Sequence, residues 1–132
     1  MNSMPRITPY LLYEDATEAV KWLERAFGFR ERTANRDPNG RVTHAELVLG
    51  EDGLILLGQP PAGYKNPKNL GQKTQSLYVY VDDVDQHCAR ARSNGATIIE
   101  EPNDAPYGDR RYGAHDPEGH VWYFAAPKRS GS

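Results

Sequence analysis

The chain has 132 residues, a length that fits one domain with a sizeable hydrophobic core. Its formal net charge is -2, so the overall charge gives no reason to expect a nucleic acid or an anionic membrane surface as partner. The single cysteine excludes an intrachain disulfide and favours a reducing, cytoplasmic compartment, and no apolar run is long enough to span a membrane.

The first half of the chain predicts one helix among four strands. Asp15 is suited to cap the helix, because Glu18 stands three residues later in a capping-box arrangement. Apolar residues follow at helical spacing, and Gly28 is suited to end the helix in a left-handed turn. Alternating or apolar segments predict strands over 7–14, 29–36, 41–50 and 54–57.

The second half repeats this order after a loop over 58–74 that is rich in Gly, Pro, Asn and Lys. A strand over 76–81 precedes a helix that Asp83 caps and Gly95 ends. A strand over 96–100 and a hairpin over 107–124 follow. The hairpin turns at Asp116-Pro117-Glu118-Gly119, which resembles Asp37-Pro38-Asn39-Gly40 in the first half.

The repeat predicts an α+β fold of two tandem βαβββ modules that form a curved mixed sheet with the helices on its convex face. We expect a single domain over 1–132, with modules at 5–58 and 75–127 and a linker at 59–74. Aligning the helix caps pairs Tyr10 with Tyr78, and aligning the two turns pairs His44 with Tyr123.

Strand alternation places apolar residues on the helix-covered face and polar or aromatic residues on the open face. An open face with tyrosines, a histidine and a carboxylate predicts a cup that binds a small organic molecule. The expected lining is Thr8, Tyr10, His44, Glu46, Ser76, Tyr78, Tyr80 and Tyr123. Arg110 and Arg111 point to opposite faces of a regular strand, so one of them lines the cup. We assign Arg111, as an anchor for a carboxylate or phosphate; the alternative is an ion pair with a surface acid.

The same residues also allow other interpretations. His44 and Glu46 form either a ligand-contacting or acid/base pair, or a polar pair with no ligand. The tyrosines either stack on a ligand or pack in a dimer interface, and in the second case the protein is an interaction module. His115 is expected at a turn or edge, and Lys73 is expected in solvent or in a mobile lid. Cys88 is expected in the core.

Four segments resemble the vicinal oxygen chelate superfamily, which includes glyoxalase I, bleomycin- and fosfomycin-resistance proteins and extradiol dioxygenases. They are PYLLYEDATEAVKWLERAFGF, HAELVLG, SLYVYVDDVD and YGDRRYGAHDPEGHVW. The resemblance covers nearly the whole chain and is strongest to the small glyoxalase-like or bleomycin-resistance-like proteins. It implies a homodimer in which paired modules form cup-shaped sites.

The resemblance also implies where a metal would bind, because metal-using members place ligands on four strands, two from each module. By strand register those places are Thr8, His44 (or Glu46), Ser76 and Tyr123. Hydroxyl groups are poor ligands for a divalent cation. We therefore expect no metal or other cofactor, and a protein that binds a small molecule, as in resistance by sequestration. The alternative is a lyase or isomerase that uses His44 and Glu46, with or without a divalent metal.

Overall fold

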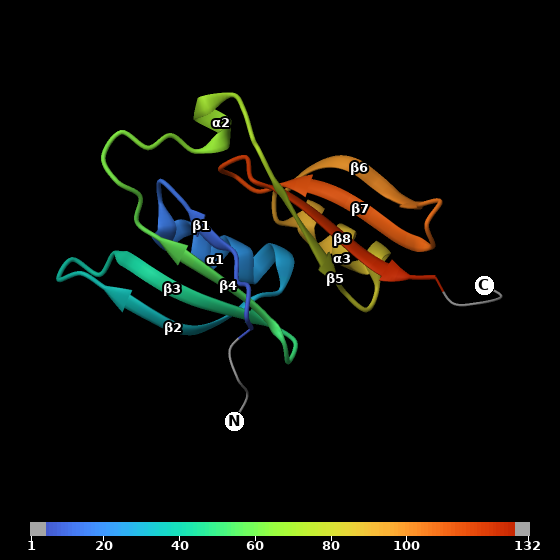
Figure 1. Ribbon diagram of the computed structural model, residues 1–132, viewed down its shortest axis with the longest axis horizontal. Coiled ribbons are helices and arrows are strands. Elements are labelled where there is room, and N and C mark those ends of the chain that lie inside the picture. The colour runs from blue at the N-terminus through green and yellow to red at the C-terminus, as the bar shows by residue number, and fades with distance from the viewer. Residues whose placement is uncertain (1–4, 129–132) are drawn as a thin grey trace. The chain divides into compact units, whose positions relative to one another are not determined.

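Two βαβββ modules follow one another along the chain, which confirms the predicted α+β fold class (Figure 1). The computed structural model describes residues 5–128, which divide into two compact units on either side of the Asn66–Pro67 bond. Each unit contains its own four-stranded mixed sheet. No helix within the described residues is long and apolar enough to cross a membrane.

The first unit has four strands in the order β1-β4-β3-β2. β1 runs parallel to β4, and the other neighbours are antiparallel. The elements are β1 (Tyr10–Leu12), α1 (Ala16–Phe27), β2 (Arg30–Arg36), β3 (Val42–Leu49) and β4 (Gly53–Gly58).

Helix α1 covers one face of this sheet. The Asp15 carboxylate accepts a hydrogen bond from the Glu18 N–H at 3.1 Å, and Gly28 ends the helix at a φ of 84°, so both predicted ends are confirmed. The apolar side of α1 packs against β2, β3 and β4. Ala45 and Leu47 of β3 are fully buried. The alternating residues of β3 therefore lie on the open face.

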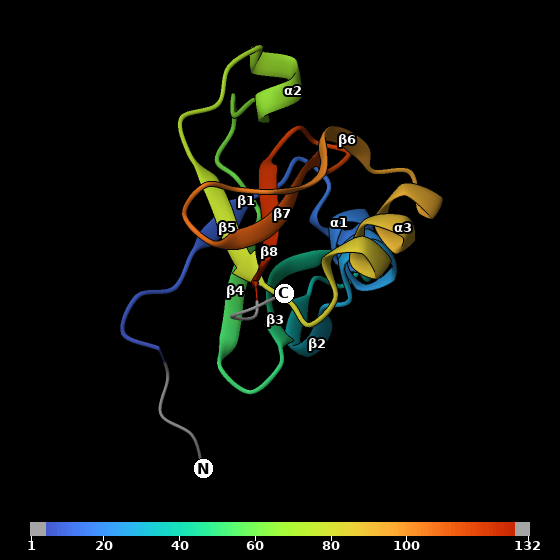
Figure 2. The same cartoon turned by 90° about the vertical axis from the view of Figure 1, so that its right-hand side faces the viewer.

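The second unit repeats the arrangement, with strand order β5-β8-β7-β6 and α3 packed against β6, β7 and β8 (Figures 1 and 2). Trp122 and Phe124 are fully buried, and Cys88 of α3 is buried, as the sequence predicts. The elements are α2 (Pro67–Leu70), β5 (Ser76–Tyr80), α3 (Val84–Ser93), β6 (Thr97–Asp104), β7 (Asp109–His115) and β8 (Val121–Pro127).

The predicted equivalence of the two Asp-Pro-x-Gly turns is wrong. The first turn joins β2 to β3, whereas the second joins β7 to β8. Strand β8 lies beside β5 as β4 lies beside β1, so β8 corresponds to β4. Tyr123 is paired with Tyr78, and Leu56 is paired with Tyr10. The counterpart of Tyr123 in the first module is therefore Leu56 and not His44.

Candidate functional site

On the open face of the first sheet, Tyr10 and His44 lie against each other. The Tyr10 hydroxyl is 3.3 Å from His44 Nδ1, and the rings meet edge to face with centroids 5.7 Å apart. The Tyr10 ring crosses Gly58, where an added Cβ would collide with it, so the absence of a side chain at Gly58 makes room for the ring. Tyr10 remains 55% exposed.

Glu46 lies on the same face of β3 but has a different partner from His44. Its Oε1 accepts a hydrogen bond from Arg32 Nε at 2.9 Å and forms an ion pair with Arg32 Nη2, also at 2.9 Å. Within residues 5–128 no hydrogen bond joins His44 to Glu46. Thr8 lies outside the shortened β1, and its hydroxyl is 3.5 Å from the Pro5 carbonyl oxygen.

On the open face of the second sheet, aromatic rings from adjacent strands lie side by side. Tyr78 and Tyr80 alternate on β5 and meet edge to face at 5.6 Å. Tyr123 on β8 pairs with Tyr78, with ring centroids 6.4 Å apart. Its ring lies over Gly113, where an added Cβ would come within 2.7 Å of the ring. Ser76 is exposed at the start of β5.

The hydroxyl groups on this face meet at Asp109. Its Oδ2 accepts hydrogen bonds from Tyr78 at 2.9 Å and Tyr80 at 3.0 Å, and the Tyr107 hydroxyl is 2.9 Å from that of Tyr78. Partial burial, together with the bonds to Tyr107 and Asp109, raises the pKa of Tyr78 well above its usual range. The pKa of Tyr80 is raised mainly by its hydrogen bond to Asp109. Both phenols are therefore neutral at physiological pH.

Arg111 joins the aromatic residues of this face to a carboxylate on β6. Its Nε and Nη2 donate to the two oxygens of Glu100 at 2.8 and 3.0 Å, and this pairing lowers the pKa of Glu100. The guanidinium lies 4.6 Å from the centre of the Tyr123 ring, and Nη1 donates to the Tyr107 hydroxyl at 3.1 Å. Arg110 points to the helix side, where it binds Asp85 of α3.

The structure thus gathers Tyr78, Tyr80, Tyr123 and Arg111 on one face, and Tyr10, His44 and Glu46 on the other sheet's open face. Sequence reasoning missed Tyr107, Asp109 and Glu100 as members of the second group. Alternation on β7 provided a signal for Asp109, because a residue two before Arg111 shares its face. No comparable signal existed for Tyr107, which precedes β7.

These features define a class: a protein of two βαβββ modules with polar and aromatic open faces. The sequence profile of the Glyoxalase/Bleomycin resistance protein/Dioxygenase superfamily matches residues 4–124, and the chain belongs to this family.

Similar proteins come from several bacteria. TioX from Micromonospora sp. ML1 is 33% identical, with a TM-score of 0.78 over 96% of this chain and 99% of that one. Uncharacterized protein Rv0887c of Mycobacterium tuberculosis (strain ATCC 25618 / H37Rv) is 32% identical, over 98% of this chain and 78% of that protein. A glyoxalase/bleomycin resistance protein/dioxygenase family enzyme from Burkholderia phytofirmans PsJN shares the fold, at 21% identity and a TM-score of 0.68 over 89% of this chain and 94% of that one.

The residues at the positions implied for a metal do not fit a divalent cation. With the corrected strand equivalence these positions hold Thr8, Leu56, Ser76 and Tyr123, which offer no imidazole, carboxylate or thiolate. Over 5–128 no group of three or more His, Cys, Asp and Glu side chains is placed to hold a metal ion. We therefore derive no chemistry through a metal.

Proposed function

We propose that the protein binds a small planar organic molecule on the open face formed by β5, β7 and β8. The observation that carries the proposal is the group of tyrosine rings held by Asp109. Tyr78 is 40% exposed and Tyr80 is 58% exposed, yet both hydroxyls are fixed by hydrogen bonds. Rings held in place lose little conformational entropy when a ligand stacks on them.

The chemistry of this face favours an aromatic ligand. Exposed tyrosine rings offer apolar surface for stacking, and the Arg111 guanidinium adds positive charge beside Tyr123. Because Arg111 already binds both oxygens of Glu100, its charge is compensated and does not require an anionic ligand. We therefore infer a neutral or weakly polar planar group as the part that is recognised.

Family membership supports binding as the purpose of this face, because the family includes bleomycin resistance proteins. Such binding would serve resistance by sequestration, in which holding the compound is sufficient. The side chains at the four positions implied for a metal are poor ligands for a divalent cation, which supports binding that does not depend on a metal.

A lyase or isomerase that uses His44 and Glu46 is the second candidate. The observation in its favour is the Tyr10–His44 pair, which lies on an open face as a general base requires. Against it, the Glu46 carboxylate is held by Arg32 rather than by His44. A histidine oriented by a tyrosine and an acid held by an arginine support polar contacts more than coupled proton transfer.

Calorimetric titration of the full chain against a panel of planar aromatic compounds tests the proposal. Tyr78→Leu and Tyr80→Leu are expected to weaken binding by roughly threefold to tenfold each, from the ~0.5–1.5 kcal/mol of an aromatic contact. Tyr80→Phe keeps the ring and is expected to retain most of the affinity. Tyr10→Leu is the matched variant on the first sheet and is expected to leave the affinity unchanged.

Three results would contradict the proposal. One is binding that survives both leucine variants on β5. Another is a stoichiometric divalent metal whose removal abolishes binding. The last is conversion of a bound compound, detected by mass spectrometry and lost in His44→Ala; this result favours the enzyme instead.

A further inference from the structure

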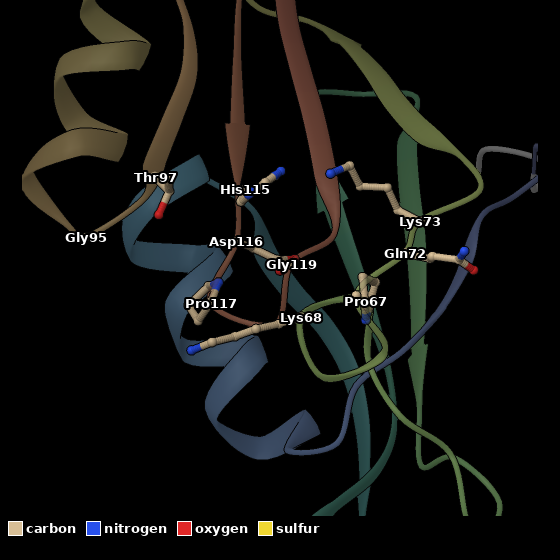
Figure 3. Close-up of a pocket in the computed structure, with 11 residues that line it drawn as sticks. Pro67, Lys68, Gln72, Lys73, Gly95, Thr97, His115, Asp116, Pro117 and Gly119 are labelled. Carbon is tan, nitrogen blue, oxygen red and sulfur yellow. The ribbon is translucent and has the colours of Figure 1, made fainter.

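The second unit contains a pocket of about 500 Å³ that none of the tyrosines described above lines (Figure 3). One wall is the end of β7 with the β7–β8 turn, and the other is the segment from α2 to Lys73. The Lys68 N–H donates to the Glu118 carbonyl oxygen at 3.0 Å, which fixes α2 against this turn. The volume lies in the usual range for small-molecule sites.

Two lysines and one aspartate line this pocket, so its side chains carry a net positive charge. Lys68 and Lys73 line it, and neither amino group forms an ion pair within residues 5–128. The only acidic lining residue is Asp116, which is 4% exposed. Its Oδ1 accepts from two backbone N–H groups and its Oδ2 from the Trp122 indole, so its carboxylate is already engaged.

His115 lines the pocket and has one ring nitrogen without a hydrogen-bond partner within residues 5–128. Its Nε2 is buried and lacks a hydrogen-bond partner among the described residues. Burial, and next the nearby Lys73, lower the pKa of His115, and the Asp116 carboxylate opposes them only in part, so the ring is neutral at physiological pH. Figure 3 shows the His115 and Lys73 side chains extending toward each other. Thr97 pairs with His115 across β6 and β7 and also lines the pocket.

A buried nitrogen without a partner is rare in folded proteins and calls for an explanation. Here the residue with the unpartnered nitrogen lines one cavity together with Thr97 and two lysines that form no ion pair in the described part of the chain, and Lys73 is the lysine that extends toward His115. We propose that the pocket is a second binding site, which takes the oxyanion group, carboxylate or phosphate, of a small molecule. Lys73 supplies the charge, and the Nε2–H tautomer of His115 donates to the anion. This proposal does not depend on the proposed function of the tyrosine-bearing face.

The test is an NMR titration of the ¹⁵N-labelled full chain with inorganic phosphate, phenyl phosphate and benzoate, against sodium chloride at equal ionic strength. Saturable shifts are expected at the amides of Lys73, Thr97, His115 and Gly119, with β5 unaffected. The imidazole ¹⁵N resonance of His115 Nε2 is expected to move with them. If phenyl phosphate saturates the shifts at a lower concentration than benzoate, the preferred ligand group is a phosphoryl group. If benzoate saturates them at the lower concentration, the preferred group is a carboxylate.

Substitutions distinguish a specific anion-binding site from nonspecific attraction of anions to lysine side chains. Lys73→Met and His115→Leu each remove a donor and are expected to weaken binding by about tenfold, the effect of losing a charge-assisted hydrogen bond. Lys65→Met removes the same charge from the same loop but outside the pocket lining, and is expected to have no effect. Shifts that rise linearly without saturation, or equal weakening by Lys65→Met, would overturn the proposal. An unchanged spectrum of each free variant verifies its fold.

Discussion

Replacing Asp109 with asparagine tests whether this carboxylate organises the tyrosine-bearing face. The substitution keeps the shape but removes the charge that accepts hydrogen bonds from Tyr78 and Tyr80. A hydrogen bond to a charged acceptor contributes about 1 kcal/mol more than one to a neutral acceptor. For the bond from Tyr78, which is 40% exposed, solvent screening reduces this difference. We expect its loss to lower the free energy of unfolding by about 0.5–1 kcal/mol.

The pKa values provide the sharper measurement. The pKa of Tyr80 is expected to fall furthest toward the ordinary value of 10.0, because the bond to Asp109 is the main cause of its shift. The pKa of Tyr78 is expected to fall less, because burial contributes most there. Tyr112 is an internal control, since burial raises its pKa without Asp109. Titration of assigned ¹³Cζ tyrosine signals measures all three.

The direction of the pH effect follows from the raised values. Below pH 10 these phenols are protonated in the folded and unfolded chains, so their stabilising contribution is fully present. Above pH 10 the unfolded chain ionises first, and stability falls as the pH rises toward the folded pKa values. The fall is expected to be smaller in Asp109→Asn. Asp104→Asn removes the same charge from an exposed ion pair and serves as control. Unchanged titration of Tyr78 and Tyr80 in Asp109→Asn would refute the reasoning.

Substitutions at three further positions have defined effects on the free energy of unfolding, each measured by urea denaturation. Asp116→Ala removes a buried carboxylate that accepts hydrogen bonds from two backbone N–H groups and from the Trp122 indole. It is expected to lower the free energy of unfolding by about 2–4 kcal/mol. A smaller loss than that caused by Asp15→Ala would contradict this expectation. Gly119→Ala places a Cβ within 2.6 Å of the Lys68 nitrogen at a φ of 90°, and is expected to cost about 1–3 kcal/mol. Asp15→Ala removes the N-cap of α1 and is expected to lower the free energy of unfolding by about 1 kcal/mol. Asp15→Asn is expected to lower it less, because asparagine can still cap the helix.

Much of the fold was predictable because its signals are local. The caps at Asp15 and Asp83 each accept from the N–H three residues later, as the capping boxes predict. The missed features lack such local signals. β6 continues through Pro102 because it is an outer strand, where a missing N–H costs little. α2 has four residues, too few to show a helical period.

The wrong turn alignment has a physical reason. Asp-Pro-x-Gly specifies how the chain reverses, because it sets local φ angles and side-chain hydrogen bonds. In both copies the aspartate carboxylate accepts from the N–H two residues on, for example from Asn39 to Asp37 at 2.9 Å and from Glu118 to Asp116 at 3.0 Å. Such a motif does not specify which strands it joins. Strand pairing does, and it is not local.

Only those features of the candidate site that follow from the alternation of residues along a strand were predictable from the sequence. Alternation predicted the faces of Tyr78, Tyr80 and His44. It did not reveal Asp109 as the common acceptor, because an acid beside two arginines suggests an ion pair. In the structure Arg110 turns to α3 and Arg111 to Glu100, which leaves Asp109 to the tyrosines.

The corrected equivalence shows that the two modules share architecture and differ in chemistry. Leu56 and Tyr123 occupy the same place in their sheets, so one module offers an aliphatic group where the other offers an aromatic ring. In the first module, the acid on the open face is neutralised by Arg32. In the second, the acid holds two phenols with their rings exposed. A ligand that stacks therefore gains most on the second sheet. For this reason, substitutions at Tyr80 and Tyr10, which are similarly exposed at 58% and 55%, are expected to have unequal effects on binding.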